Sequence, residues 1–185
     1  MRPAGYLVNH PGGLQGEQGL FYDYLVASNG VFIRAENPLL KAIICIAEAD
    51  IRGLAPLQEK VELVHGKVPD RLGQLATSIM QGACDREVYV AIAWEGEYRL
   101  RMPEQCGEGV SIEYHCVPNT VVEMHSHGRM QAFFSSTDTR DEQGLRVYGV
   151  IGEADNLWPT CLLRSGVYGY FSPLVWRDVF EEVPA

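Results

Sequence analysis

The sequence predicts an α/β protein that carries a mainly β extension at its N-terminus. Residues 1–65 contain two segments rich in β-branched residues, each preceded by a turn signal. The rest of the chain opens with one strongly periodic helix and continues with five strand-like segments. We therefore expect an N-terminal β-rich extension over residues 1–65 and an α/β domain over residues 66–185.

The composition narrows the classes of function. Of the 185 residues, 46% are apolar and 21% are charged, and the net charge is −9, which is typical of a globular protein but not of a nucleic-acid-binding one. The five cysteines are an odd number and form no Cys-x-x-Cys, which argues against a disulfide scaffold or a zinc ribbon. The N-terminus has no signal-peptide core, and no apolar run is as long as a membrane span. These features predict a cytoplasmic protein that binds neither nucleic acid nor membranes directly.

Two strands are expected in the extension. Residues 30–35 follow Asn29-Gly30, and residues 41–47 follow Asn37-Pro38, so each segment has a turn in front of it. The glycine-rich run HPGGLQGEQG, residues 10–19, is predicted to be a loop. It contains no Gly-Lys-Ser/Thr, so it is not expected to bind phosphate.

The clearest period in the chain follows Pro69. Apolar residues recur there at steps of three and four: Leu72, Leu75, Ala76, Ile79, Met80, Ala83 and Cys84. They form one stripe on a helix over residues 70–84, with Asp70 as the expected N-cap. A buried strand is predicted next, over residues 87–94.

The remaining elements are expected to be strands and one short helix. Further strands are predicted over residues 98–102, 110–116, 120–125 and 145–151. A helix is expected to begin near residues 136–138, because Ser, Thr and Asp favour N-caps and the following acidic residues favour a first turn. The aromatic-rich C-terminal third is predicted to supply β-rich closing segments.

Two histidines lie one residue apart in the stretch HSHGRMQAFFSSTD, residues 125–138. Alternate side chains of an extended segment share a face, so His125 and His127 are expected to project together. Histidine is the commonest metal ligand, and Asp138 at the start of the next helix would add a carboxylate oxygen. Three protein ligands leave one position for water, which is the pattern of a catalytic zinc site.

The complete string is more specific than the histidine pair, because a chain of this histidine content has a His-x-His by chance in about one case in eight. His-Ser-His, seven residues, Ser, two residues and Asp resembles the JAMM signature of the JAB/MPN metalloprotease family. The resemblance implies that His125, His127 and Asp138 bind zinc and that Ser135 helps to hold the tetrahedral intermediate. It also implies an upstream glutamate after the first helix, which in this chain is Glu87.

The resemblance covers residues 65–185 and implies a mixed, curled β-sheet flanked by helices, similar to the cytidine deaminase fold. The implied activity is zinc-dependent hydrolysis of peptide or isopeptide bonds, in which Glu87 assists the attack of zinc-bound water and Glu87 and Ser135 are the catalytic residues. The chain lacks the Cys-Gly-Leu-Leu run common after that glutamate. The alternative is a non-catalytic MPN-type scaffold or binding module in a bacterial cassette-encoded complex.

Two N-terminal segments resemble a narrower subgroup, called PRTRC system protein A. They are FYDYLVASNGVFIRA, residues 21–35, and IRGLAPL, residues 51–57. Proteins of this subgroup are encoded in bacterial cassettes beside a ThiF-like (E1-like) protein and a small ubiquitin-like protein. The resemblance therefore implies a ubiquitin-like protein as the substrate and the E1-like protein as a further partner.

Three nearby residues have alternative roles. Glu123 lies two residues before His125 and is either an ordinary strand carboxylate or a rival base or fourth ligand. His115 is either a hydrogen-bonded structural histidine or a member of the site. Ser126 is expected to form a hydrogen bond either to the backbone or in support of the ligand histidines.

Overall fold

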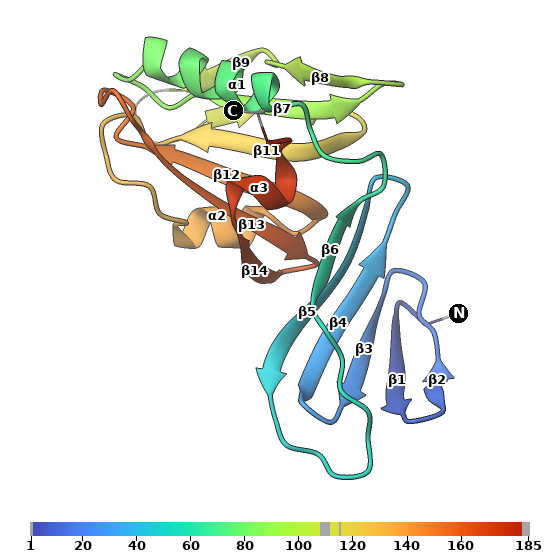
Figure 1. Ribbon diagram of the computed structural model, residues 1–185. Coiled ribbons are helices and arrows are strands. Elements are labelled where there is room, and N and C mark those ends of the chain that lie inside the picture. The colour runs from blue at the N-terminus through green and yellow to red at the C-terminus, as the bar shows by residue number, and fades with distance from the viewer. Residues whose placement is uncertain (1, 108–111, 115, 183–185) are drawn as a thin grey trace.

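The computed structural model describes residues 2–107, 112–114 and 116–182 (Figure 1). The N-terminal strands are β1 (Ala4–His10), β2 (Gly13–Glu17), β3 (Tyr22–Ala27), β4 (Gly30–Glu36), β5 (Leu40–Glu48) and β6 (Lys60–Leu63). They form one sheet in the order β2-β1-β3-β4-β5-β6. The strands predicted over residues 30–35 and 41–47 are confirmed as β4 and β5.

The C-terminal part contains the helices α1 (Asp70–Gly82), α2 (Ser136–Asp141) and α3 (Trp176–Val179). Its larger sheet consists of β7 (Tyr89–Trp94), β8 (Tyr98–Arg101), β11 (Thr120–Ser126), β12 (Leu145–Gly152), β13 (Thr160–Val167) and β14 (Tyr170–Leu174). The order is β14-β13-β12-β11-β7-β8. Strands β9 (Gln105–Gly107) and β10 (Ile112–Tyr114) pair separately.

Both large sheets are mixed. β1 and β3 pair in parallel in the first sheet, β11 and β12 pair in parallel in the second, and the other pairs are antiparallel. The predicted α/β class is confirmed in this coarser form. The curled, deaminase-like shape of the sheet stays a prediction, as does the domain boundary at residue 65.

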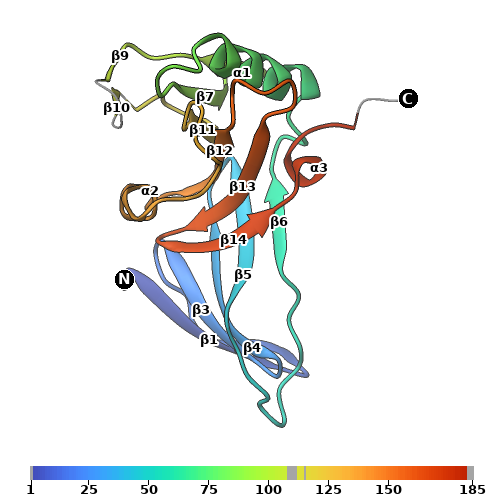
Figure 2. The same ribbon diagram turned by 90° about the vertical axis from the view of Figure 1, so that its left-hand side faces the viewer.

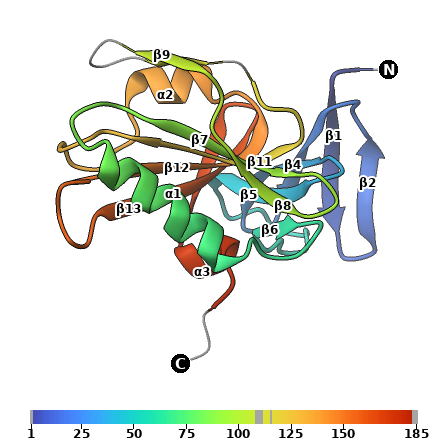
Figure 3. The ribbon, with the colours of Figure 1, turned by 90° about the horizontal axis from the view of Figure 1, so that it is seen from above.

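Helices α1 and α2 lie on opposite sides of the second sheet (Figures 2 and 3). Leu72, Ala76 and Met80 of α1 belong to a buried core with Val122 and Met124 of β11. The alternate residues of β11 point to the other face, where α2 lies. Side chains at positions 123 and 125 of β11 therefore face α2 rather than the α1 core.

The two sheets share one hydrophobic core. Ile33, Leu40 and Ile44 of the N-terminal sheet belong to the same buried cluster as the α1 residues. The hydroxyl groups of Tyr24 and Tyr170 also lie 3.0 Å apart across the contact between the sheets. The N-terminal sheet therefore packs directly against the part of the chain that carries the histidines.

Several predicted boundaries were wrong. The segment 10–19 is not a loop: it contains the turn and the second strand of the hairpin of β1 and β2, and Gly13 and Gly16 accommodate it with φ values of 112° and 135°. Every residue of β2 is exposed, so no alternation marks it as a strand. The N-cap of α1 is Pro69, and Asp70 is the first helical residue; its carboxylate accepts a hydrogen bond from Trp176 Nε1 at 2.8 Å instead.

The other differences lie at the ends of elements. Helix α1 ends at Gly82, and β7 begins at Tyr89, so Glu87 precedes the strand. Of the strand predicted over residues 110–116, the structure describes β10, and His115 lies outside the described residues. No helix in the described part of the chain is long and apolar enough to span a membrane.

Candidate metal centre

Strand β11 places the two histidines on one face of the sheet. His125 pairs with Tyr89 of β7 on one side and with Val150 of β12 on the other. The backbone N–H of His127 donates to the carbonyl of Ile151 at 2.8 Å, so the extended pairing with β12 continues past the end of β11. The alternation of an extended chain therefore brings both imidazoles to the face that α2 covers.

The first turn of α2 fixes the carboxylate of Asp138. Ser135 is the N-cap, and its Oγ accepts a hydrogen bond from the backbone N–H of Asp138 at 3.1 Å. In return, Oδ2 of Asp138 accepts from the backbone N–H of Ser135 at 2.6 Å. This reciprocal capping box follows from the local sequence Ser-Ser-Thr-Asp and confirms the predicted start of the helix.

The side chains of His125, His127 and Asp138 converge on one point. The Nε2 atoms of the two histidines lie 3.2 Å apart, and Nε2 of His125 lies 3.4 Å from Oδ1 of Asp138. Nε2 of His127 lies 3.9 Å from Oδ2 of Asp138. Ligand atoms around a tetrahedral zinc ion are separated by about 3.3 Å when the bonds are about 2.0–2.1 Å long. The spacing thus fits a metal ion, and these residues form the one three-residue group with such spacing in the described part of the chain.

The surroundings of His127 and Asp138 favour the protonation states that ligate metals. Burial lowers the pKa of His127, and His125 acts in the same direction, while Asp138 and the Gln131 backbone oppose them. Burial by itself would raise the pKa of Asp138, but contacts with His125 and Ser135 outweigh it and hold the pKa well below its usual range. A neutral imidazole and an ionised carboxylate are what a zinc ion requires.

The imidazole of His127 is enclosed more tightly than that of His125. The His127 side chain is 5% exposed and the His125 side chain 19%. Phe133 packs edge-on against the His127 ring, with the ring centroids 4.6 Å apart. Of the three side chains, those of His125 and Asp138 are therefore the more exposed, with Asp138 at 16%.

Glu87 lies next to the histidines although it is not part of the three-residue cluster. Ser126 and Val88 continue the antiparallel pairing of β11 and β7, which brings Glu87 level with His127 on the same face. Burial raises the pKa of Glu87; His125 opposes this shift and the negative charge of Asp138 adds to it. Glu87 and His127 also line an open pocket of about 420 Å³.

The alternative residues have other partners. The carboxylate of Glu123 is buried and forms an ion pair with Arg146. It shares a face with His125, but it lies outside the three-residue cluster. Ser126 Oγ accepts from the backbone N–H of Val88 at 3.0 Å, which is the backbone role among those expected of it.

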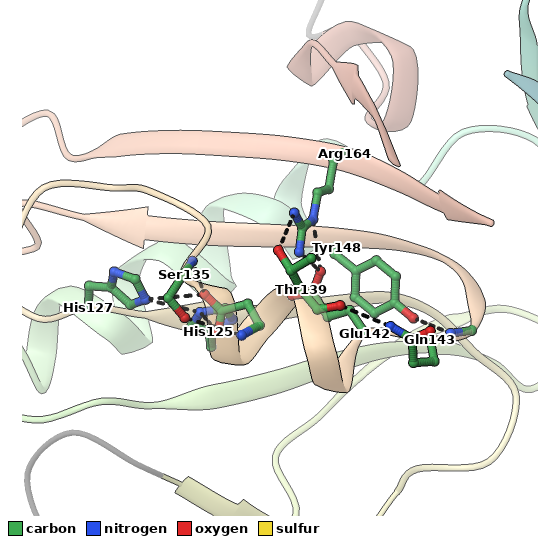
Figure 4. A network of polar contacts seen from close by, with 10 residues as sticks. His125, His127, Ser135, Thr139, Glu142, Gln143, Tyr148 and Arg164 are labelled. Carbon is green, nitrogen blue, oxygen red and sulfur yellow. Dashed lines mark hydrogen bonds and ion pairs between the residues drawn. The ribbon is translucent and has the colours of Figure 1, made fainter. Parts of the chain in front are cut away.

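Arg164 and Glu142 form a buried ion pair beside this cluster that was not predicted from the sequence (Figure 4). Burial raises the pKa of Glu142 to about 7, although the Arg164 guanidinium opposes the shift. The signal for this pair in the sequence is the charged Arg164 within the strand TCLLRSGV, because an arginine in a buried strand needs a partner of opposite charge.

One comparison with known proteins bears on these residues. Residues 117–162 match the family described as prokaryotic homologs of the JAB domain. The match includes His125, His127, Ser135 and Asp138 and leaves Glu87 outside. A search of curated proteins found no match to the chain. The match confirms the resemblance noted from the motif at the level of the family, whereas the PRTRC subgroup stays a prediction. Residues 117–162, the segment that carries the histidines and the aspartate, are therefore similar to prokaryotic JAB domains.

Proposed function

We propose that the protein is a zinc-dependent hydrolase of peptide or isopeptide bonds. The observation that carries the proposal is the convergence of His125, His127 and Asp138 with the spacing of tetrahedral ligands, beside a carboxylate that is not a ligand. Bound at these three residues, zinc supplies Lewis-acid activation of a water molecule and of the substrate carbonyl group.

Glu87 is the proposed general base and acid. Its raised pKa brings the carboxyl group closer to neutrality, which suits a group that must take a proton from water and then give it to the leaving amine. Glu87 lies level with His127, so its carboxylate is near the proposed ligands without being one of them and can transfer protons.

Ser135 is proposed to stabilise the oxyanion. In the capping box its Oγ accepts from the backbone N–H of Asp138, so the hydroxyl proton remains available for donation. A donor held in place before the reaction stabilises developing charge without the cost of reorganisation. Asp138 therefore orients the same serine that would contact the substrate oxygen.

The proposed substrate is the C-terminal tail of a ubiquitin-like protein, or its amide link to a lysine. This choice follows from the resemblance of residues 21–35 and 51–57 to the PRTRC subgroup. The E1-like protein of the same cassette is the corresponding further partner.

The test uses two substrates: the cassette's ubiquitin-like protein fused through its C-terminus to a reporter, and the same protein joined to a lysine side chain. We expect zinc-loaded protein to cut at the end of the ubiquitin-like tail, and a chelator or Glu87→Gln to abolish the cut. An Arg34→Gln variant, altered in the N-terminal sheet, serves as the control and should cut at close to the wild-type rate. Tight binding of intact substrate with no cleavage would instead support the non-catalytic scaffold.

A further inference from the structure

Arg164 is a buried cation on β13, beside the cluster but not part of it. Its Nε and Nη2 donate to Oε2 of Glu142 at 2.9 and 2.6 Å, and its Nη1 donates to Oγ1 of Thr139 at 3.4 Å. Its guanidinium carbon lies 3.8 Å from the ring centroid of Phe134 and 3.7 Å from that of Phe171. The guanidinium is thus stacked between two rings and hydrogen-bonded at its edge.

These contacts flank Asp138 along the chain. Phe134 directly precedes the N-cap Ser135, Thr139 directly follows Asp138, and Glu142 is the C-cap of α2. The backbone N–H of Glu142 also donates to the carbonyl of Asp138 at 2.8 Å. Figure 4 shows Arg164 reaching from its strand to Thr139 and Glu142 on the side of α2 away from His127.

Within the residues that the structure describes, few other contacts hold helix α2 in position. It is six residues long, and none of those residues is buried. Such a short helix is not stable by itself and depends on tertiary contacts. The capping box orients Asp138 relative to the helix, but it does not fix the helix relative to β11, where the histidines lie.

We infer that Arg164 is the positioning residue that holds Asp138 opposite His125 and His127, by fastening both ends of α2 to β13. The inference rests on the proposed metal site and adds a residue to it outside the ligand set. Arg164 acts through Phe134, Thr139 and Glu142 and touches none of the ligand side chains in the contacts described above.

The chemistry of the contact favours arginine over lysine. A planar guanidinium can stack between two rings and donate from its edge at the same time, whereas an ammonium group has neither the plane nor the fork. Both hydrogen bonds to Glu142 end on Oε2, so a proton can be carried by the other oxygen without loss of the contact. The position of α2 is therefore maintained in either protonation state of Glu142.

The experiment compares zinc affinity, measured by competition with a chromophoric chelator, in four full-length proteins: wild type, Arg164→Gln, Arg164→Lys and the double variant Glu142→Gln/Arg164→Gln. The double variant leaves no unpaired buried carboxylate, so it folds even where the single variant is unstable. The matched control is Arg34→Gln, because Arg34 also donates from Nε and Nη2 to one carboxylate oxygen, that of Asp23, far along the chain in the N-terminal sheet.

We expect the three Arg164 variants to bind zinc 10- to 100-fold more weakly than wild type, the usual range for residues that support ligands. The absorption spectrum of the cobalt-substituted protein should also change, because a displaced Asp138 alters the coordination. Arg34→Gln should keep the wild-type affinity and spectrum. Wild-type affinity and spectrum in the folded double variant would overturn the inference while the proposed function stands. A wild-type protein that binds no zinc would overturn the proposed function and the inference with it.

Discussion

Ser126 and Val88 exchange two hydrogen bonds, one from the backbone N–H of Ser126 to the carbonyl of Val88 at 2.9 Å and one from the backbone N–H of Val88 to Oγ of Ser126 at 3.0 Å. The second bond uses a side chain in place of a backbone carbonyl. Together they extend the pairing of β11 and β7 beyond His125 and Tyr89, and so bring Glu87 level with His127.

Replacing Ser126 with alanine should therefore misplace Glu87. Ser126→Ala leaves the buried N–H of Val88 without its partner, which costs about 1–3 kcal/mol of unfolding free energy. We expect zinc affinity to change little, because both histidines remain, and the rate of hydrolysis to fall. Denaturant unfolding and zinc titration check this, and an unchanged unfolding free energy would contradict it.

The role of Glu87 is distinguished from that of Glu123 by paired substitutions. Glu87→Gln should keep the fold and the zinc, because no ligand is lost, while activity falls about 10²-fold or more. Glu123→Gln should keep activity within a few-fold, because Glu123 is paired with Arg146. Cleavage rates at saturating zinc decide between them, and a dead Glu123→Gln beside an active Glu87→Gln would assign the base to Glu123.

Substitution of a proposed ligand should reduce the amount of zinc that the protein retains. We expect about one zinc per wild-type chain and a large loss in His125→Ala, with weaker retention in Asp138→Asn. Elemental analysis after dialysis measures both. The ligand assignment fails if His125→Ala retains as much zinc as the wild type.

Ser135 is expected to contribute to both stability and rate. Ser135→Ala removes the N-cap of α2 and should cost about 1 kcal/mol, whereas Ser135→Thr keeps a capping hydroxyl. If the hydroxyl also stabilises the oxyanion, the alanine variant should lose about 10²-fold or more in kcat with zinc bound. Equal kcat values for Ser135→Ala and wild type would show that Ser135 acts only as the N-cap of α2.

The pH dependence follows from His127. The pKa of His127 is lowered from the ordinary value of 6.5, so the folded state favours the neutral imidazole. The neutral imidazole therefore contributes to the stability of the fold above pH 6.5, and this contribution is lost as the pH falls through the lowered pKa. Zinc requires the same neutral form, so binding should be nearly constant between about pH 7 and 8 and weaken below roughly pH 6. Zinc titrations at several pH values measure this, and unchanged affinity at pH 5 would count against histidine ligands.

The local parts of this structure could be predicted from the sequence. The apolar spacing after Pro69 indicated α1, and the string Ser-Ser-Thr-Asp indicated the start of α2. Both depend on residues within a few positions of one another, where periodicity and capping decide the conformation. The hairpin of β1 and β2 was not predicted, because its second strand is exposed throughout and gives no alternating pattern.

By itself, the sequence determined which residues could ligate a metal: it placed His125 and His127 on one face of an extended segment and Asp138 in a capped first turn. Tertiary structure alone decided what lies around them. The register of β7 against β11 brings Glu87 level with His127. Arg146 forms an ion pair with Glu123, and Arg164 on β13 donates hydrogen bonds to Glu142 at the end of α2. These partners are separated by more than twenty residues along the chain. Their pairing depends on strand order and register, which the packing of the whole sheet fixes rather than any local pattern.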